Sequence, residues 1–281
     1  MRKIGVYKLT GSFKMCIIYN VILCDVRGGV FLEIVRGSNK RIPDMKALWL
    51  EAFPDDSEFV HVFFEKFYRP SKALLRYDNG ELVSMLFYMD VKMKANRRVL
   101  KGAYLYGVAT KLTERHAGHF SALHEVLTER LTEKKYKFVC AIPASDSLFS
   151  MYKKFGYNTF FRRTEYSITT LDFDTLTPEQ AWERRLDAYK KSKRGIKLLE
   201  SREMFIESTK GHLFLGFDGG YFAFAKKGGS YKMYEVCDPE GAAPPHELVH
   251  YERSGVLLDL GAGFDEDAFE KEKPCLNYLM N

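Results

Sequence analysis

The chain has 281 residues, of which 46% are hydrophobic and 28% are charged, the composition of an ordinary globular protein with room for one large or two small domains. Its five cysteines include no Cys-x-x-Cys pair, which favours free thiols in a reducing cytoplasm and implies no metal site. The net charge divides into +11 on residues 1–170 and −5 on residues 171–281. A positive field of this kind favours a ligand that carries phosphates. The basic residues form no nucleic-acid-binding motif, so no nucleic-acid partner is expected.

The first 31 residues combine basic side chains with an apolar run, Met15–Cys24, and so resemble the outline of a signal sequence. No small-residue cleavage site follows, and the run is too short to span a bilayer. We therefore expect an arm that forms an extra strand or hairpin, or a start codon assigned too far upstream, with no targeting or membrane role.

The next part of the chain predicts alternating helices and antiparallel strands. Pro43 stands where a helix begins, and Asn79-Gly80 suits a tight type I′ turn between two strands. Phe59, Phe63 and Phe67 recur at helical spacing. The expected elements are a strand at 32–35, helices at 42–52 and 59–67, a hairpin of strands 73–77 and 82–89, and a strand at 99–110.

The segment after the last of these strands predicts an anion site. Arg115-His-Ala-Gly118 precedes a helix whose apolar residues are Phe120, Leu123, Leu127 and Leu131. The N–H groups that open a helix point outward, and Gly118 allows close approach to the backbone. An ordinary connection, with Gly for the turn and Arg on the surface, is the alternative.

A second apolar strand at 138–142 and a short helix ending in Phe155-Gly-Tyr follow. This order resembles the GNAT superfamily of acetyl-CoA-dependent N-acetyltransferases over about residues 32–168. Val108-Ala109-Thr110 is similar to the strand that pairs with the pantetheine arm of CoA, and Arg115-x-x-Gly118-x-Phe120 to the pyrophosphate loop. Phe149-x-x-Tyr152-x-x-x-Gly156-Tyr157 resembles the late Phe-Tyr-x-x-x-Gly-Phe segment.

The resemblance implies an α+β fold with a mixed, mostly antiparallel sheet flanked by helices, and acetyl-CoA as cosubstrate without a metal. The cofactor-binding residues it implies are Val108, Ala109, Thr110, Arg115, His116, Ala117, Gly118, His119, Phe120 and Ser121. Phe120 departs from the family pattern, which has a small residue there. Because Phe120 begins the apolar stripe of the helix, we expect its ring to lie in the core.

The implied reaction is acetyl transfer to a primary amine of a small molecule or peptide, by direct attack in a ternary complex. The resemblance assigns Val108 to the backbone amide that supports the thioester carbonyl, and Tyr152 to the acid that protonates the departing thiolate. Phe149, Tyr152 and Phe155 also have the spacing of an aromatic cluster on a core-packed helix, which is the alternative for Tyr152.

The base is less defined, because residues 103–107 contain no Glu or Asp. Tyr104 and Tyr106 are candidates for positioning a water, whereas His116, His119 and His124 are expected to contact solvent or phosphate. In Eis-like enzymes the terminal carboxylate acts as base, which here implies Asn281. The apolar C-terminal segment is otherwise expected to be a last strand.

Past residue 168 the pattern restarts. Thr177-Pro-Glu-Gln180 predicts a capped helix to about residue 191, and a second helix begins near Ser201. Strands at 213–217, 221–225 and 231–236 form a meander with no phosphate loop after it. We therefore divide the chain into an arm (1–31), a catalytic domain (32–170) and a smaller α+β domain (171–281), which resembles a degenerate GNAT-like half as in Eis-like enzymes. The alternatives are a catalytically silent CoA-binding regulatory module and an acyltransferase that uses a longer acyl or aminoacyl donor.

Overall fold

The computed structural model describes residues 21–27, 30–53, 57–95, 98–168, 173–191, 196–227 and 229–264. Their contacts divide the chain into two units. The first unit holds the described residues up to Met89 together with Leu105–Lys135, and the second holds Asp90–Tyr104 and the described residues from Tyr136 onward. This division does not coincide with a boundary at residue 170, so the three-part division of the chain stays a prediction.

The first unit is built on an antiparallel meander in the order β1-β2-β3-β4-β5. Residues 21–27 pair with β2, as expected for an extra strand, while residues 1–20 lie outside the described part. Asn79 and Gly80 both have positive φ, 47° and 84°, as the type I′ turn requires. The elements are β1 (Val21–Arg27), β2 (Val30–Arg36), η1 (Asn39–Arg41), α1 (Ile42–Ala52), α2 (Ser57–Val62), η2 (Phe63–Phe67), η3 (Pro70–Lys72), β3 (Ala73–Asp78), most of β4 (Glu81–Ala95), the end of β5 (Arg98–Thr110), η4 (Leu112–Glu114) and α3 (His119–Glu133).

Aromatic rings fill the core of the first unit around Trp49 of α1. The ring of Trp49 lies 4.8 Å from that of Phe63 and 5.6 Å from those of Phe87 and Tyr106. Helix α3 contributes the fully buried Leu123, Leu127 and Leu131, so the predicted apolar stripe is confirmed at these positions.

The second unit is also a mostly antiparallel sheet, in the order β6-β13-β7-β12-β11-β10-β8. The start of β5 pairs with β6 in parallel, and β9 pairs with the end of β4. The elements that follow β5 are β6 (Phe138–Ala141), α4 (Asp146–Lys153), β7 (Asn158–Ile168), β8 (Asp174–Leu176), α5 (Pro178–Lys191), β9 (Ile196–Leu199), α6 (Arg202–Ser208), β10 (Leu213–Phe217), β11 (Gly220–Lys227), β12 (Ser230–Cys237) and β13 (His246–Asp259).

Strand β13 is the main element that the sequence did not predict. It runs antiparallel to β6, with Val256 opposite Ala141, and along most of β7, with His246 opposite Ile168. Its partners precede it by many residues, so no local pattern announces the pairing. The apolar run Val256-Leu257-Leu258 is the signal that could have shown a buried strand.

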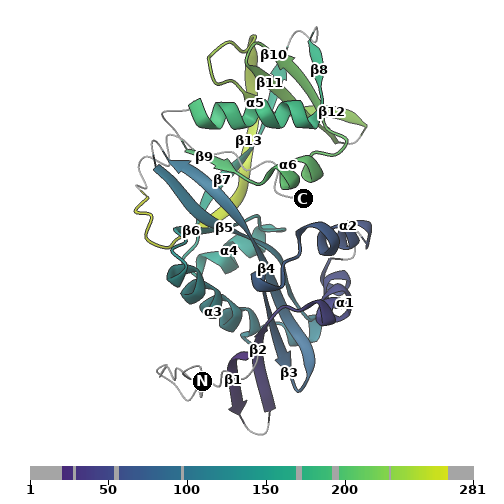
Figure 1. Ribbon diagram of the computed structural model, residues 1–281, viewed down its shortest axis with the longest axis vertical. Coiled ribbons are helices and arrows are strands. Elements are labelled where there is room, and N and C mark those ends of the chain that lie inside the picture. Colours follow the sequence, from purple (N-terminus) through teal and green to yellow (C-terminus); the bar gives the residue numbers. More distant parts are fainter. Residues whose placement is uncertain are drawn as a thin grey trace. The chain divides into compact units, whose positions relative to one another are not determined.

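The predicted helix opening at Thr177 is confirmed by a reciprocal pair of hydrogen bonds. The N–H of Gln180 donates to Thr177 Oγ1 at 3.2 Å, and the N–H of Thr177 donates to Gln180 Oε1 at 2.8 Å. Helix α5 then packs across β10, β11 and β12 (Figure 1). Trp182 of α5 and Phe205 of α6 lie in the resulting core. Among the described residues, no helix combines the length and apolar character needed to cross a membrane.

Candidate functional site

The end of β5 presents one edge of backbone that faces away from β4. The carbonyl of Ala109 accepts a bond from the buried Ser84 hydroxyl of β4 at 2.9 Å, and the N–H of Lys111 donates to a β4 carbonyl at 2.9 Å. Backbone groups alternate between the two edges of a strand. The N–H and C=O groups of Val108 and Thr110 therefore point to the opposite edge.

Pairing on that opposite edge is short. The ladder with β6 spans only Gly102–Tyr104, and within the described part of the chain no strand pairs with this edge of β5 after Tyr104. Gly107 has φ of 53°, a left-handed conformation that inside a strand marks a bulge. A Cβ at Gly107 would lie 2.7 Å from the Trp49 ring, so only glycine fits. The backbone of Val108–Thr110 is thus left as an open strand edge directly after the bulge.

The loop that follows β5 is exposed and leads into a helix N-terminus. All four residues of Arg115–Gly118 are exposed. His116 and Gly118 have φ of 68° and 78°, and a Cβ at Gly118 would meet nothing within 4 Å. The first intrahelical bond of α3 runs from the N–H of Ala122 to the carbonyl of Gly118 at 3.2 Å. An open loop before the first turn of a 15-residue helix has the geometry of an anion site.

Side chains on both sides hold this loop in place. The N–H of Leu112 donates to Glu51 Oε1 of α1 at 2.8 Å. His119 Nε2, at the start of α3, lies 3.5 Å from Glu114 Oε2 of η4. Burial, together with the positive charge of Arg76, lowers the pKa of His119, so its ring is neutral near pH 7.

The histidines and Phe120 differ from the sequence-based expectations. His119 and His124 are only 5% and 7% exposed, so their side chains are not solvent contacts, whereas His116 is exposed; contact of these histidines with phosphate stays a prediction. Phe120 is partly exposed, its ring 5.6 Å from that of His124, and the prediction that it lies in the core is wrong. The helix begins at His119, and its turn places His119 and Leu123, rather than Phe120, on the inner face.

Tyr152 lies on α4, in the second unit, and is 5% exposed. Its ring makes an edge contact with that of Tyr157 at 5.1 Å, and Phe149 beside it is buried. Burial raises the pKa of Tyr152 well above its ordinary value, so the hydroxyl stays protonated in the neutral range. These facts suit a member of a packed aromatic cluster and a protonated acid alike, and the acid role of Tyr152 stays a prediction.

The other candidates for proton transfer divide between buried and partly exposed positions. Tyr104 is 2% exposed, whereas Tyr106 is partly exposed and stacks on Phe63 at 5.5 Å. Asn281, whose terminal carboxylate is the candidate base, lies outside the described residues.

Comparison with known proteins agrees with this arrangement. Residues 33–160 match the family model described as an acetyltransferase (GNAT) domain. This segment is therefore similar to a GNAT acetyltransferase domain. The general reaction of that family is acetyl transfer to an amine. No curated protein sequence matches the chain.

Solved structures with a similar fold extend the likeness beyond this segment. A GCN5-related N-acetyltransferase from Kribbella flavida is 16% identical with a TM-score of 0.63, over 82% of this chain and 71% of that one. Eis1 from Mycobacterium abscessus is 10% identical with a TM-score of 0.59, over 82% and 73%. A putative acetyltransferase from Pyrococcus horikoshii is 16% identical with a TM-score of 0.52, over 89% and 96%. These shares exceed the part of the chain that residues 33–160 make up, so the resemblance in fold to acetyltransferases, Eis1 included, is confirmed beyond the matched segment.

Several residues that shape the matched segment were not identified from the sequence. Ser84 holds the end of β5, because its hydroxyl donates to the carbonyl of Ala109. The same Ser84 Oγ lies 2.8 Å from Thr110 Oγ1. Glu51 holds the loop through the N–H of Leu112 and Glu114 lies beside His119, and no local signal marks either of them. Gly107 did leave a signal, because an isolated glycine inside a strand pattern suggests a bulge.

Proposed function

We propose that the chain is an N-acetyltransferase that moves the acetyl group of acetyl-CoA to a primary amine of a small molecule or peptide. The observation that carries this proposal is the continuity of one segment, residues 108–121, in which an open strand edge leads through an exposed loop into a helix N-terminus. The pantetheine arm of CoA contains amides that can pair with a strand edge. Its diphosphate is the kind of anion that binds to helical N–H groups. Open space at Gly118 leaves room for that diphosphate.

The transfer requires one bond to form and one to break. The neutral amine nitrogen attacks the carbonyl carbon of the thioester, the carbon–sulfur bond breaks, and the thiolate leaves. The N–H of Val108, which points to the open edge of β5, is assigned to the carbonyl oxygen. The hydroxyl of Tyr152 is assigned to protonate the thiolate. The proton lost by the amine passes to a water.

Thiol release tests the reaction itself. The full chain is mixed with acetyl-CoA and a panel of primary amines, and free CoA thiol is measured over time. We expect release above the rate of spontaneous hydrolysis with at least one amine. Release that never depends on the amine would contradict the proposed transfer.

The loop assignment has a matched pair of variants at Gly118. Gly118→Glu places a negative charge where the diphosphate is expected, whereas Gly118→Ala adds only a methyl group to open space at the same φ of 78°. By calorimetry we expect CoA binding to be lost in the Glu variant and largely kept in the Ala variant. Unchanged CoA affinity in Gly118→Glu would place the diphosphate elsewhere.

A second candidate function is a silent module that binds CoA and regulates a partner. The partly exposed ring of Phe120 favours it, since the ring occupies a position that is small in the family pattern, and residues 103–107 supply no carboxylate. CoA binding by calorimetry without thiol release for any amine would support this candidate. A comparison of acetyl with longer acyl donors in the same assay decides whether the donor is larger.

A further inference from the structure

The second unit contains a pocket that has no role in the proposed transfer reaction. Its volume is about 140 Å³, and its walls come from α5, β7, β9 and β12. A water molecule takes about 30 Å³ in the liquid. The pocket therefore has room for roughly five groups of the size of a water molecule. A very small metabolite has about this total size.

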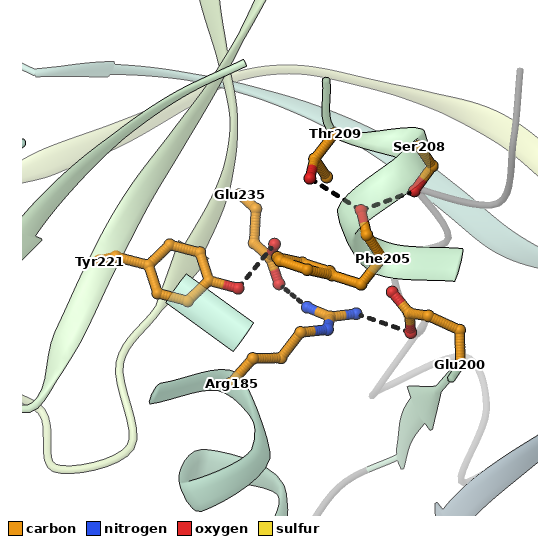
Figure 2. A network of polar contacts seen from close by, with 7 residues as sticks. All are labelled: Arg185, Glu200, Phe205, Ser208, Thr209, Tyr221 and Glu235. Carbon is orange, nitrogen blue, oxygen red and sulfur yellow. Dashed lines mark hydrogen bonds and ion pairs between the residues drawn. The ribbon is translucent and has the colours of Figure 1, made fainter. Parts of the chain in front are cut away.

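Arg185 and Glu235 line the pocket, and together with Glu200, which is not a lining residue, they form a charged group that we call the Arg185 cluster (Figure 2). Arg185 Nη2 lies 3.5 Å from Glu200 Oε2, and Arg185 Nη1 donates directly to Glu235 Oε1. The hydroxyl of Tyr221 donates to Glu235 Oε2 at 3.4 Å. Two carboxylates thus share one guanidinium.

The Arg185 cluster has surplus negative charge and spare hydrogen-bond acceptors. With both carboxylates ionised, its net charge is −1. Glu235 lines the pocket, and an ionised carboxylate can accept more bonds than the two it receives here. This wall therefore suits a ligand group that is positive and donates hydrogen bonds.

Another part of the pocket lining is positively charged. Lys197 of β9 lines the pocket and makes no ion pair or hydrogen bond with any residue that the structure describes. Its cross-strand neighbour Lys94, in contrast, does have hydrogen-bond partners, because Lys94 Nζ donates to the carbonyls of Tyr189 and Lys190 at 2.9 and 2.8 Å. Burial raises the pKa of Cys237 to about 12, and the charge of Lys197 opposes that rise, which places the ammonium near this wall.

Tyr189 adds a donor to the lining. Its side chain lines the pocket at the end of α5, and its hydroxyl is buried without a hydrogen-bond partner in the described chain. A hydroxyl left in this state costs free energy, which a ligand acceptor could recover. The ammonium of Lys197 and the hydroxyl of Tyr189 together suit a ligand carboxylate.

We propose that this pocket binds a small zwitterion of the α-amino acid class, with its ammonium toward Glu235 and its carboxylate toward Lys197 and Tyr189. The volume of about 140 Å³ admits glycine, alanine or serine. The proposal is independent of acetyl transfer, since none of its residues has a role in the proposed reaction.

A ligand panel on the unmodified full chain tests the charge pattern by calorimetry. The panel comprises glycine, alanine and serine, with propionate as the analogue that lacks the ammonium and ethylamine as the one that lacks the carboxylate. We expect an amino acid to bind in the millimolar range or tighter, and each single-charge analogue to bind at least about 10-fold more weakly, because charge-assisted bonds contribute that much. No binding by any amino acid would overturn the proposal. Propionate binding as tightly as alanine would also overturn it, and would make the pocket a plain anion site.

Variants locate the binding to this pocket. Lys197→Met removes the ammonium and keeps a similar chain length, so we expect the affinity for the bound amino acid to fall about 10- to 100-fold while CoA binding stays unchanged. Lys226→Met is the matched control, because Lys226 is an exposed lysine of β11 that does not line the pocket. Unchanged amino acid affinity in Lys197→Met would overturn the assignment. If that variant does not fold, Tyr189→Phe replaces it, with a smaller loss expected from the missing hydroxyl.

Discussion

Replacing Tyr152 by phenylalanine separates its two possible roles. The substitution keeps a ring that is 5% exposed and stands 5.1 Å from that of Tyr157, and removes only the hydroxyl. If the hydroxyl protonates the CoA thiolate, turnover should fall about 100-fold or more, the usual contribution of a positioned acid. Folding and CoA affinity should hardly change, because the packing of the ring is retained.

Replacing Tyr152 by alanine removes the ring as well as the hydroxyl, so the difference in stability between the Phe and Ala variants measures the packing contribution of the ring. Removing a ring that is 95% buried leaves a cavity beside Phe149 and Tyr157, and losses of this type cost about 3 kcal/mol of unfolding free energy. For a chain of this size that corresponds to a drop in Tm of about 6 to 12 °C. The cluster role therefore predicts a stable, active Phe variant and an unstable Ala variant.

The assay combines thiol release with thermal unfolding on the same preparations. Tyr157→Phe is the matched control, because Tyr157 is a neighbouring buried tyrosine without an assigned part in the reaction. Burial raises the pKa of Tyr152, so a catalytic effect should not depend on its ionisation between pH 6 and about 9. Full activity in Tyr152→Phe would refute the acid role, and the proton would then come from another group.

Three further outcomes follow from the described contacts. Gly107→Ala should lower the unfolding free energy by about 2 kcal/mol or more, because the new Cβ would lie 2.7 Å from the Trp49 ring and the residue has a φ of 53°. Urea titration measures this loss, and an unchanged unfolding free energy would mean that the bulge relaxes. Burial lowers the pKa of His124 from 6.5 to about 4, so the unfolded chain takes up this proton first and stability should fall by up to about 3 kcal/mol from pH 6.5 to 4. That pH dependence should be smaller in His124→Leu, and equal slopes in the two proteins would show that the ring is hydrated. Thr177→Ala should lower the unfolding free energy by about 1 kcal/mol by removing the cap on α5, and an unchanged Tm would contradict that contribution.

The features that the sequence predicted well depend on short-range interactions. Thr177 and Gln180 cap α5 through bonds between residues three apart, and Asn79-Gly80 forms its turn through its own φ angles. The strand, loop and helix around Gly118 could be recognised for the same reason, because residue types at fixed spacing determine where backbone N–H groups are exposed.

The features that the sequence did not predict depend on partners that are distant along the chain. Strand β13 is defined by its pairing with β6 and β7, and the burial of His119 in place of Phe120 depends on which face of α3 meets the sheet. The Arg185 cluster joins side chains from α5, β12 and the end of β9. Periodicity in a sequence identifies an apolar face, but not the distant segment that covers it. The pocket beside the Arg185 cluster therefore became visible only once the tertiary structure had brought those segments together.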